Sequence, residues 1–271
     1  MRRSLYIALL LSLTACQQYE YQGTTLRFAP ARDTDTETLS DACSKLAVMA
    51  FTPAGERAMN RVWTQERSTG NFGQMPIDMS AGLYTFVVVG HSSPKTPTIK
   101  SPQLVQFSTD NNRKNSDTFC WCDTLTITDW QRSIAIELER LTAMFRLVVT
   151  GDVPDNVTQW VFDYTGGSAK VNPVTKHGCT KSKQSEIRSA DEPLEVFTFP
   201  FMSDSCGITI RIVAKDALMN DLKERSFSDV PMVRNRITEF RGDFFGDGLM
   251  QPVGITFSAD GNWSGTTVVE F

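Results

Sequence analysis

Apolar residues recur at every second position along almost the whole chain. Residues 208–212 read Ile-Thr-Ile-Arg-Ile, and residues 253–257 alternate in the same way. A period of two places the apolar side chains of an extended segment on one face, which is typical of a half-buried β-strand. Only residues 37–45 and 216–225 are compatible with helices, and both segments are short. The pattern therefore predicts an all-β fold.

The parity of the alternation changes near Arg140. Apolar residues occupy even positions in 134–138 and odd positions in 141–149. A shift by one residue sends every side chain to the opposite face, so a regular strand cannot bury both sets on one side. We expect two β-sandwich domains, 16–139 and 140–271. A bulged strand inside one large sandwich is the alternative.

The first residues have the features of a bacterial lipoprotein signal. Two arginines precede an apolar run at positions 5–13, which is too short to span a bilayer, and Leu-Thr-Ala-Cys ends at Cys16. We expect residues 1–15 to be a signal peptide and Cys16 to carry lipid, whose several acyl chains would anchor the protein stably. Glutamines at positions 17 and 18, in place of Asp, favour the outer membrane. An ordinary signal peptide followed by a chance cysteine is the alternative.

The charge of the exported chain is small and evenly mixed. The whole chain of 271 residues has a net charge of −4. Without the first 15 residues, which include two arginines, 256 residues remain with a net charge of −6. No basic face is evident, so nucleic acid is not an expected partner.

Five cysteines remain once Cys16 is assigned to lipid. Because this number is odd, at least one of them cannot form a disulfide within the chain and stays a free thiol unless another chain supplies a partner. They are Cys43, Cys120, Cys122, Cys179 and Cys206. The pair at positions 120 and 122 would share one strand face without the geometry to bridge each other. A bridge from either of them to position 43, or between positions 179 and 206, stays open. With only two histidines in the chain, we expect no metal site.

Catalytic groupings are scarce. His91 precedes Ser-Ser-Pro and is expected in a surface loop, whereas His177 lies two residues before Cys179, which leaves a nucleophilic role for that thiol as a minor alternative. Glu137 and Glu139 share one face of a strand and are expected to face solvent rather than to act as acid and base. We therefore expect no enzymatic activity and no cofactor.

Three parts of the sequence together resemble the fimbrillin superfamily of Bacteroidetes type V fimbriae. They are the lipobox ending at Cys16, residues 138–149 and residues 230–245. Residues 255–257, and residues 263–265 with 268–271, are similar to the family's closing pair of strands. The resemblance implies two transthyretin-like β-sandwiches, export as a lipoprotein, and assembly with other fimbrial subunits by β-strand addition.

The family includes two kinds of subunit that treat the N-terminus differently. Shaft subunits are cut after a basic residue beyond the first strand; here that strand is expected at residues 24–28, with Arg32 as the candidate site. An ordinary loop arginine is the alternative. Anchor subunits keep their N-terminus and lipid. The segment around Arg234 and Asn235 looks more like the anchor branch, so a surface-associated anchor or accessory subunit is favoured over a processed shaft subunit.

A surface glycan-binding lipoprotein is the competing class, in which exposed aromatic rings would stack on sugar. Five tryptophans could serve, although scattered tryptophans more often pack in a core. They are Trp63, Trp121, Trp130, Trp160 and Trp263.

Overall fold

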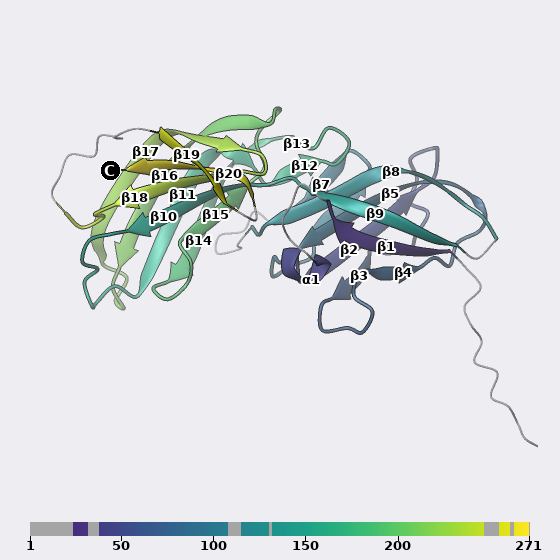
Figure 1. The fold of residues 1–271 in the computed structure, drawn as a ribbon, viewed down its shortest axis with the longest axis horizontal. Helices are drawn as coiled ribbons and strands as arrows, with labels where there is room; N and C mark the ends of the chain where they lie inside the picture. Colours follow the sequence, from purple (N-terminus) through teal and green to yellow (C-terminus); the bar gives the residue numbers. More distant parts are fainter. Residues whose placement is uncertain are drawn as a thin grey trace, which may run out of the picture.

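The computed structural model describes residues 24–31, 38–107, 115–129, 132–246, 255–260 and 263–270. These residues confirm the all-β prediction (Figure 1). The one helix among them, α1 (Leu39–Ala42), has four residues, and the described part of the chain contains no helix that could cross a bilayer. The strands are β1 (Thr25–Pro30), β2 (Lys45–Phe51), β3 (Trp63–Glu66), β4 (Gln74–Pro76), β5 (Gly82–His91), β6 (Thr98–Ser101), β7 (Leu104–Gln106), β8 (Thr118–Ile127), β9 (Ser133–Arg140), β10 (Ala143–Val149), β11 (Gln159–Ser168), β12 (Lys170–Asn172), β13 (His177–Gly178), β14 (Lys181–Ser189), β15 (Glu195–Thr198), β16 (Ser205–Lys215), β17 (Asp221–Val233), β18 (Ile237–Gly242), β19 (Ile255–Asp260) and β20 (Trp263–Glu270).

The strands up to Arg140, except β6 and β7, form one seven-stranded sheet in the order β3-β2-β5-β8-β9-β1-β4. Its central strands are buried on both faces, so their apolar residues form continuous runs instead of alternating. In β2, Val48 and Ala50 join one core cluster, whereas Met49 and Phe51 join another on the opposite face. The first cluster also contains the inward side chains of β1 and β9.

The second face of the seven-stranded sheet is covered by a smaller sheet, β13-β12-β7-β6. This sheet combines strands from both sides of Arg140, since Val171 of β12 lies opposite Val105 of β7. Both valines are buried in the same core cluster as Phe107 and Phe199. The two parts of the chain are therefore joined by backbone pairing as well as by the covalent connection.

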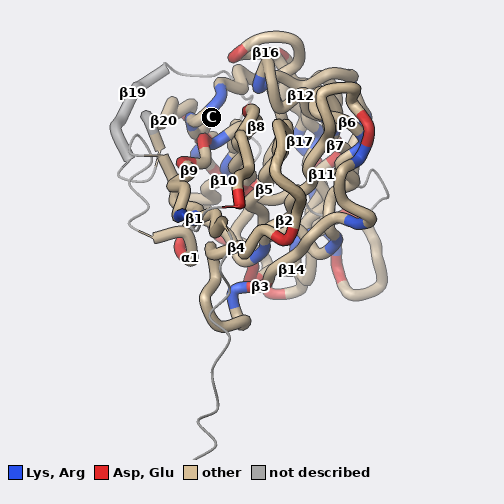
Figure 2. The backbone as a smooth tube through the Cα atoms, turned by 90° about the vertical axis from the view of Figure 1, so that its right-hand side faces the viewer, with Lys and Arg blue, Asp and Glu red and all other residues tan. Residues whose placement is uncertain are grey.

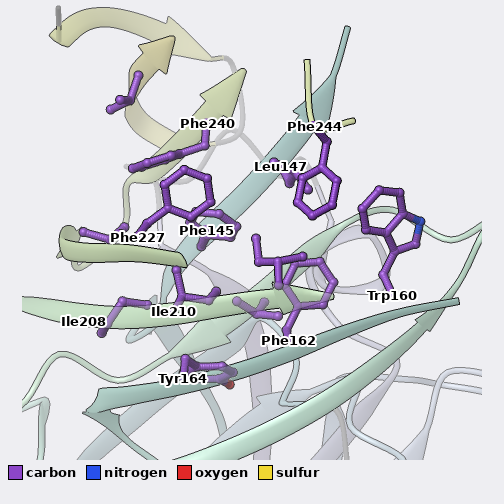
Figure 3. Packing of buried hydrophobic residues seen from close by; sticks show 14 of the residues in the cluster. Phe145, Leu147, Trp160, Phe162, Tyr164, Ile208, Ile210, Phe227, Phe240 and Phe244 are labelled. Carbon is purple, nitrogen blue, oxygen red and sulfur yellow. The ribbon is translucent and has the colours of Figure 1, made fainter. Parts of the chain in front are cut away.

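Residues after Arg140 build two further sheets, β15-β10-β18-β20-β19 and β14-β11-β16-β17. A core that is rich in aromatic side chains fills the space between them (Figure 3). Phe227 meets Phe240 edge to face with ring centres 4.5 Å apart, and Trp160 meets Phe244 in the same way at 4.9 Å. Rings in this arrangement stabilise a core beyond the area they bury.

The change of parity near Arg140 coincides with a change of sheet. Strand β9 ends at Arg140 in the seven-stranded sheet, and β10 begins at Ala143 in the five-stranded sheet. Leu141 and Thr142 connect them, so the two apolar sets face different cores and the bulged single strand does not occur. The division into domains 16–139 and 140–271 stays a prediction, because the pairing of β12 with β7 crosses it.

One expected helix is present in shortened form and the other is wrong. Helix α1 lies within residues 37–45 and begins after Thr38, whose hydroxyl accepts from Asp41 N. Residues 216–225 instead form the turn and first residues of the β16–β17 hairpin. Asp216 caps that turn by accepting from Leu218 N and Asn220 N, and Leu218 is 82% exposed rather than packed on a helix face.

Basic and acidic residues are interspersed along the described backbone, with no large region of a single sign (Figure 2). This distribution agrees with the small net charge of the sequence.

Candidate functional site

The N-terminal strand β1 is held between two neighbours and confirms the first strand expected from the sequence. It runs parallel to β9 over six residue pairs, starting with Thr25 opposite Ser133, and antiparallel to the short strand β4 over three. Thr25 N donates to Arg132 O at 2.9 Å. At the other end, Ala31 N donates to Leu138 O at 2.8 Å.

Alternate side chains of β1 enter the core. Leu26 is fully buried and Phe28 is 6% exposed, whereas Arg27 between them is exposed and its Nε donates to Ser133 Oγ at 2.8 Å. Burying an apolar side chain of this size contributes about 1.5–3 kcal/mol. Removal of β1 would therefore open an apolar groove beside β9 that another extended segment with the same alternation could fill.

The opposite wall of this groove is β4 and the turn before it. Phe28 N donates to Gly73 O at 2.8 Å, and Ile77 N donates to Thr24 O at 2.7 Å. Gly73 has a positive φ of 87°, and a Cβ there would lie 2.9 Å from Leu39 Cδ2, so glycine is required for this close approach. The turn is fixed from the far side by Gln65, whose Oε1 accepts from Gly73 N at 2.9 Å.

Two residues that the sequence assigns to this region, Cys16 and Arg32, lie outside the described residues, as does the signal segment 1–15. Lipidation and cleavage at these positions therefore stay predictions. Arg32 follows Ala31, the residue that ends the pairing of β1 with β9.

Arg140, at the end of β9, joins the two parts of the chain, a role that the sequence did not predict. It is 4% exposed, and its Nε donates to both carboxylate oxygens of Asp117, at 2.9 and 3.1 Å. Its Nη1 donates to Asn235 Oδ1 at 2.9 Å. The guanidinium lies between the rings of Phe119, 4.7 Å away, and Trp263, 4.0 Å away.

Thr142 extends this junction. Its hydroxyl donates to Asp117 Oδ1 at 2.7 Å, and its carbonyl accepts from Asn235 N at 2.9 Å. Asn235 adopts a positive φ of 57°, a conformation that asparagine tolerates better than most residues. The Arg-Asn segment singled out in the sequence is thus placed against the end of β9, with Arg234 Nη1 also 3.8 Å from Glu139.

The described tryptophans do not form an exposed platform. Trp160 and Trp263 are 2% and 8% exposed. Across neighbouring strands, Trp63 lies opposite Val48 and Trp121 lies opposite Val88, and the two valines lie opposite each other. Both tryptophan rings pack against the core cluster that contains these valines. The fifth, Trp130, lies outside the described residues.

His91 is buried, which corrects the expected surface loop. Strand β5 continues through this residue, which lies opposite Lys45 and Thr118 on the neighbouring strands. Its ring is fully buried against Phe107, and neither ring nitrogen hydrogen-bonds to another described residue. Burial, with a smaller contribution from Lys45, lowers the pKa of His91 to about 4.

His177 and Cys179 both line an open pocket of about 360 Å³, yet they are not arranged as a catalytic pair. The Cys179 thiol donates to the backbone carbonyl of His177 at 3.9 Å, and the His177 ring instead contacts Asp204 at 3.3 Å. Burial raises the pKa of Cys179, which keeps the sulfur protonated. The Asp204 carboxylate is held by Arg234 at 2.8 Å.

All five cysteines outside the lipobox are free thiols, so none of the disulfides left open by the sequence forms. Cys43 and Cys120 are buried, and the other three are partly buried. Among the described residues no cluster of His, Cys, Asp or Glu suits a metal ion. Glu137 is exposed and Glu139 forms a half-exposed ion pair with Lys176 at 2.6 Å, which confirms that this face of β9 is solvated.

Comparison with known proteins identifies a family. A family model described as fimbrillin-A associated anchor proteins Mfa1 and Mfa2 matches residues 13–218. No curated protein sequence matches the chain.

Several solved structures are similar to this chain. A candidate adhesin from Bacteroides thetaiotaomicron is 15% identical, with 75% of this chain and 79% of that one covered and a TM-score of 0.47. The fimbrial anchor protein Mfa2 from Porphyromonas gingivalis is 13% identical, with 75% and 81% covered and a TM-score of 0.43. A fimbrial assembly protein from Parabacteroides distasonis is 11% identical, with 80% and 89% covered and a TM-score of 0.44.

Proposed function

The chain belongs to the family of fimbrillin-A associated anchor proteins Mfa1 and Mfa2, and from that premise we propose that it is a lipid-anchored anchor or accessory subunit of a fimbrium. Cys16 would carry the lipid and hold the protein at the outer membrane. Other fimbrial subunits would join it by β-strand addition. The role requires no catalytic group.

The position of β1 is the observation that supports an anchor over a shaft subunit. The strand fills its groove with Leu26 and Phe28, and Cys16 precedes it on the same segment of chain. Cleavage after Arg32 would detach the lipid and β1 together from the rest of the polypeptide. A tethered subunit must therefore keep this strand, and a subunit with a vacant groove has lost its covalent tether.

The edges of the sheets also bear on strand addition. Strand β15 is an edge, but its outward carbonyls are already occupied: Glu195 O accepts from Arg188 Nη2 at 2.7 Å, and Phe197 O accepts from the Tyr164 hydroxyl at 3.2 Å. Strand β14 is longer and presents Lys181 and Lys183, a charge pattern that disfavours edge pairing. Because an anchor keeps β1 in its groove, a partner's strand would have to pair with another sheet edge, and the groove of β1 would accept a strand only in a chain cleaved after Arg32.

The anchor role is tested by N-terminal mass spectrometry of the protein from membranes and from sheared fimbriae. We expect a lipidated Cys16 in the membrane fraction, and release of the protein by Cys16→Ser. A start at Asp33 in the fimbrial fraction would instead assign the protein to the shaft. Absence of the protein from complexes with fimbrial subunits would refute a fimbrial role.

The alternative in which the protein is cleaved and the groove of β1 accepts a partner's strand is tested with a chain that begins at Asp33 and a labelled peptide of residues 24–31. We expect the peptide to bind and to raise the melting temperature, because it restores the buried side chains of β1. A control peptide with Leu26→Asp and Phe28→Asp should not bind. Purified fimbrial subunits that donate a strand should displace the first peptide, and failure of both peptide and subunits to bind would exclude this groove.

A further inference from the structure

The parallel pairing of β1 with β9 determines how the protein would respond to a pull on its N-terminus. Both strands run in the same direction, roughly along the long axis of the molecule (Figure 1). The start of β1 at Thr25 therefore lies beside the start of β9 at Ser133. The end of β9, at Arg140, lies at the opposite end of the pair and leads into the second part of the chain.

A tether at Cys16 would pull on the start of β1, whereas partners bound beyond Arg140 would pull on the end of β9. Forces applied at opposite ends of two parallel strands act along the strands, and all hydrogen bonds between them are strained together. Forces applied at the same end would separate the bonds one after another. Because rupture under force is governed by the unfolding rate, the first geometry should resist a much larger force.

The side chains of β1 oppose sliding as well. Leu26 and Phe28 occupy the core, so movement of β1 along β9 by even one residue would bring Arg27 toward the core in their place. On the β4 side, Phe28 N and the carbonyl of Thr24 are both hydrogen-bonded. The strand is thus fixed by backbone bonds on two sides and by apolar burial on a third.

The far end of β9 is attached to the second part of the chain through Arg140. Its contacts with Asn235 and Trp263 reach the turn before β18 and the start of β20. Strands β10, β18 and β20 are parallel to one another, so the same kind of pairing continues beyond the junction. Force leaving β9 would pass into three paired strands rather than into a loop.

We infer that β1 and β9 form a mechanical clamp, which transmits the tension of a membrane tether into the remainder of the protein without loss of the N-terminal strand. The inference rests on the proposed attachment at Cys16 for the point where tension enters. The resistance itself is a property of the fold.

The test is single-molecule force spectroscopy of the whole chain with click-reactive residues as attachment points. One handle is placed at Gly23, before β1. The second is placed at Glu137 in one protein, near the end of β9, and at Ser133 in the other, at the start of β9. Both second positions are exposed strand residues only four apart. A handle at Ser133 also removes the hydrogen bond from Arg27, so both proteins carry Arg27→Ala and then differ chiefly in the direction of force.

We expect the force of first rupture at equal loading rate to be severalfold higher for the Glu137 handle than for the Ser133 handle. Leu26→Ala should lower the Glu137 value, whereas Thr64→Ala on the exposed edge of β3 should not. Equal forces in the two geometries would refute the clamp even if Cys16 carries lipid. Absence of lipid together with unequal forces would refute the proposed anchor role and leave the clamp as a property of the fold.

Discussion

The guanidinium carbon of Arg140 lies 4.0 Å from the centre of the Trp263 ring, which joins the last residue of β9 to the first residue of the C-terminal strand β20. The same guanidinium is paired with Asp117 and hydrogen-bonded to Asn235. The buried charge of Arg140 is thus held by a carboxylate, an amide oxygen and two aromatic rings. A polar loop between the two parts of the chain would not make such contacts. Arg140 therefore fixes the relation between the sheets before it and those after it.

Replacement of Arg140 by leucine should be strongly destabilising. The change leaves the Asp117 carboxylate without its cation inside the junction and removes the ring contacts with Phe119 and Trp263. Loss of one partner of a fully buried ion pair typically costs about 3 kcal/mol or more, and because the Asp117 side chain is 21% exposed we expect a loss near the lower end of that range. Denaturant unfolding followed by circular dichroism measures the change in the free energy of unfolding.

Arg211→Leu is the matched control for that substitution. Arg211 also contacts acidic residues, Asp163 and Glu224, but its side chain is 42% exposed. Exposed ion pairs contribute at most about 1 kcal/mol, so this variant should unfold almost as the native protein does. Equal losses in the two variants would contradict the importance assigned to the junction.

The sequence predicted a change of sheet near Arg140 but not the role of the Arg140 side chain. There is a physical reason why only the first could be predicted. The alternation of apolar residues is local, so a change of parity is visible within a short segment of sequence. The partners of Arg140 are brought to it by the fold: Asp117 and Asn235 are 23 and 95 residues away in sequence. No periodicity connects such positions.

His91 is a second residue whose environment is set by contacts with residues distant in sequence. The following Ser-Ser-Pro indicated a loop, yet pairing with Lys45 and Thr118 extends β5 through the histidine, and Phe107 covers its ring. The local signal placed the end of the strand correctly to within a residue. It did not reveal that the strand extends through His91 or that Phe107, the residue after β7, covers the ring.

The buried His91 should make the protein less stable as the pH falls from 6.5 to 4. Its pKa is about 4 in the folded protein, against 6.5 for an unperturbed histidine. Between these values the unfolded chain binds a proton that the folded chain does not, so protonation favours unfolding. The loss reaches roughly 3 kcal/mol at pH 4 and vanishes above pH 7.

The contribution of His91 is isolated by comparison with His91→Leu across the same pH range. Since neither ring nitrogen hydrogen-bonds to another described residue, the leucine variant leaves no partner unsatisfied and should be at least as stable at pH 7. Its stability should fall less between pH 6.5 and 4 than that of the native chain. Identical pH profiles would show that His91 is accessible to protons in the folded state.

The cysteines should react with alkylating reagents in an order set by burial. Burial raises the pKa of the Cys43 thiol to about 12 and raises that of Cys120 as well, so neither forms appreciable thiolate at pH 8. Cys122, Cys179 and Cys206 are partly exposed and should be modified first. Mass spectrometry of the native protein treated with iodoacetamide gives the order, and the denatured protein is the control in which all five react. A mass two units lower for each bridge in the untreated protein would instead reveal disulfides.

Truncation of the buried side chains of β1 should weaken the attachment of the strand and, with it, the fold around β9. Leu26→Ala removes a fully buried side chain from the core and should cost about 2–5 kcal/mol. Arg27→Ala, one residue along the same strand, removes only an exposed side chain with a single hydrogen bond to Ser133 and should cost less than about 1 kcal/mol. Hydrogen exchange of the β9 amides reports whether β1 detaches locally, because amides 134, 136 and 138 face β1 in the parallel register and should lose protection first in Leu26→Ala. Unchanged protection of these amides would mean that β1 stays paired with β9 without the Leu26 side chain, because β8 pairs only with Glu139 and Arg140 at the end of β9.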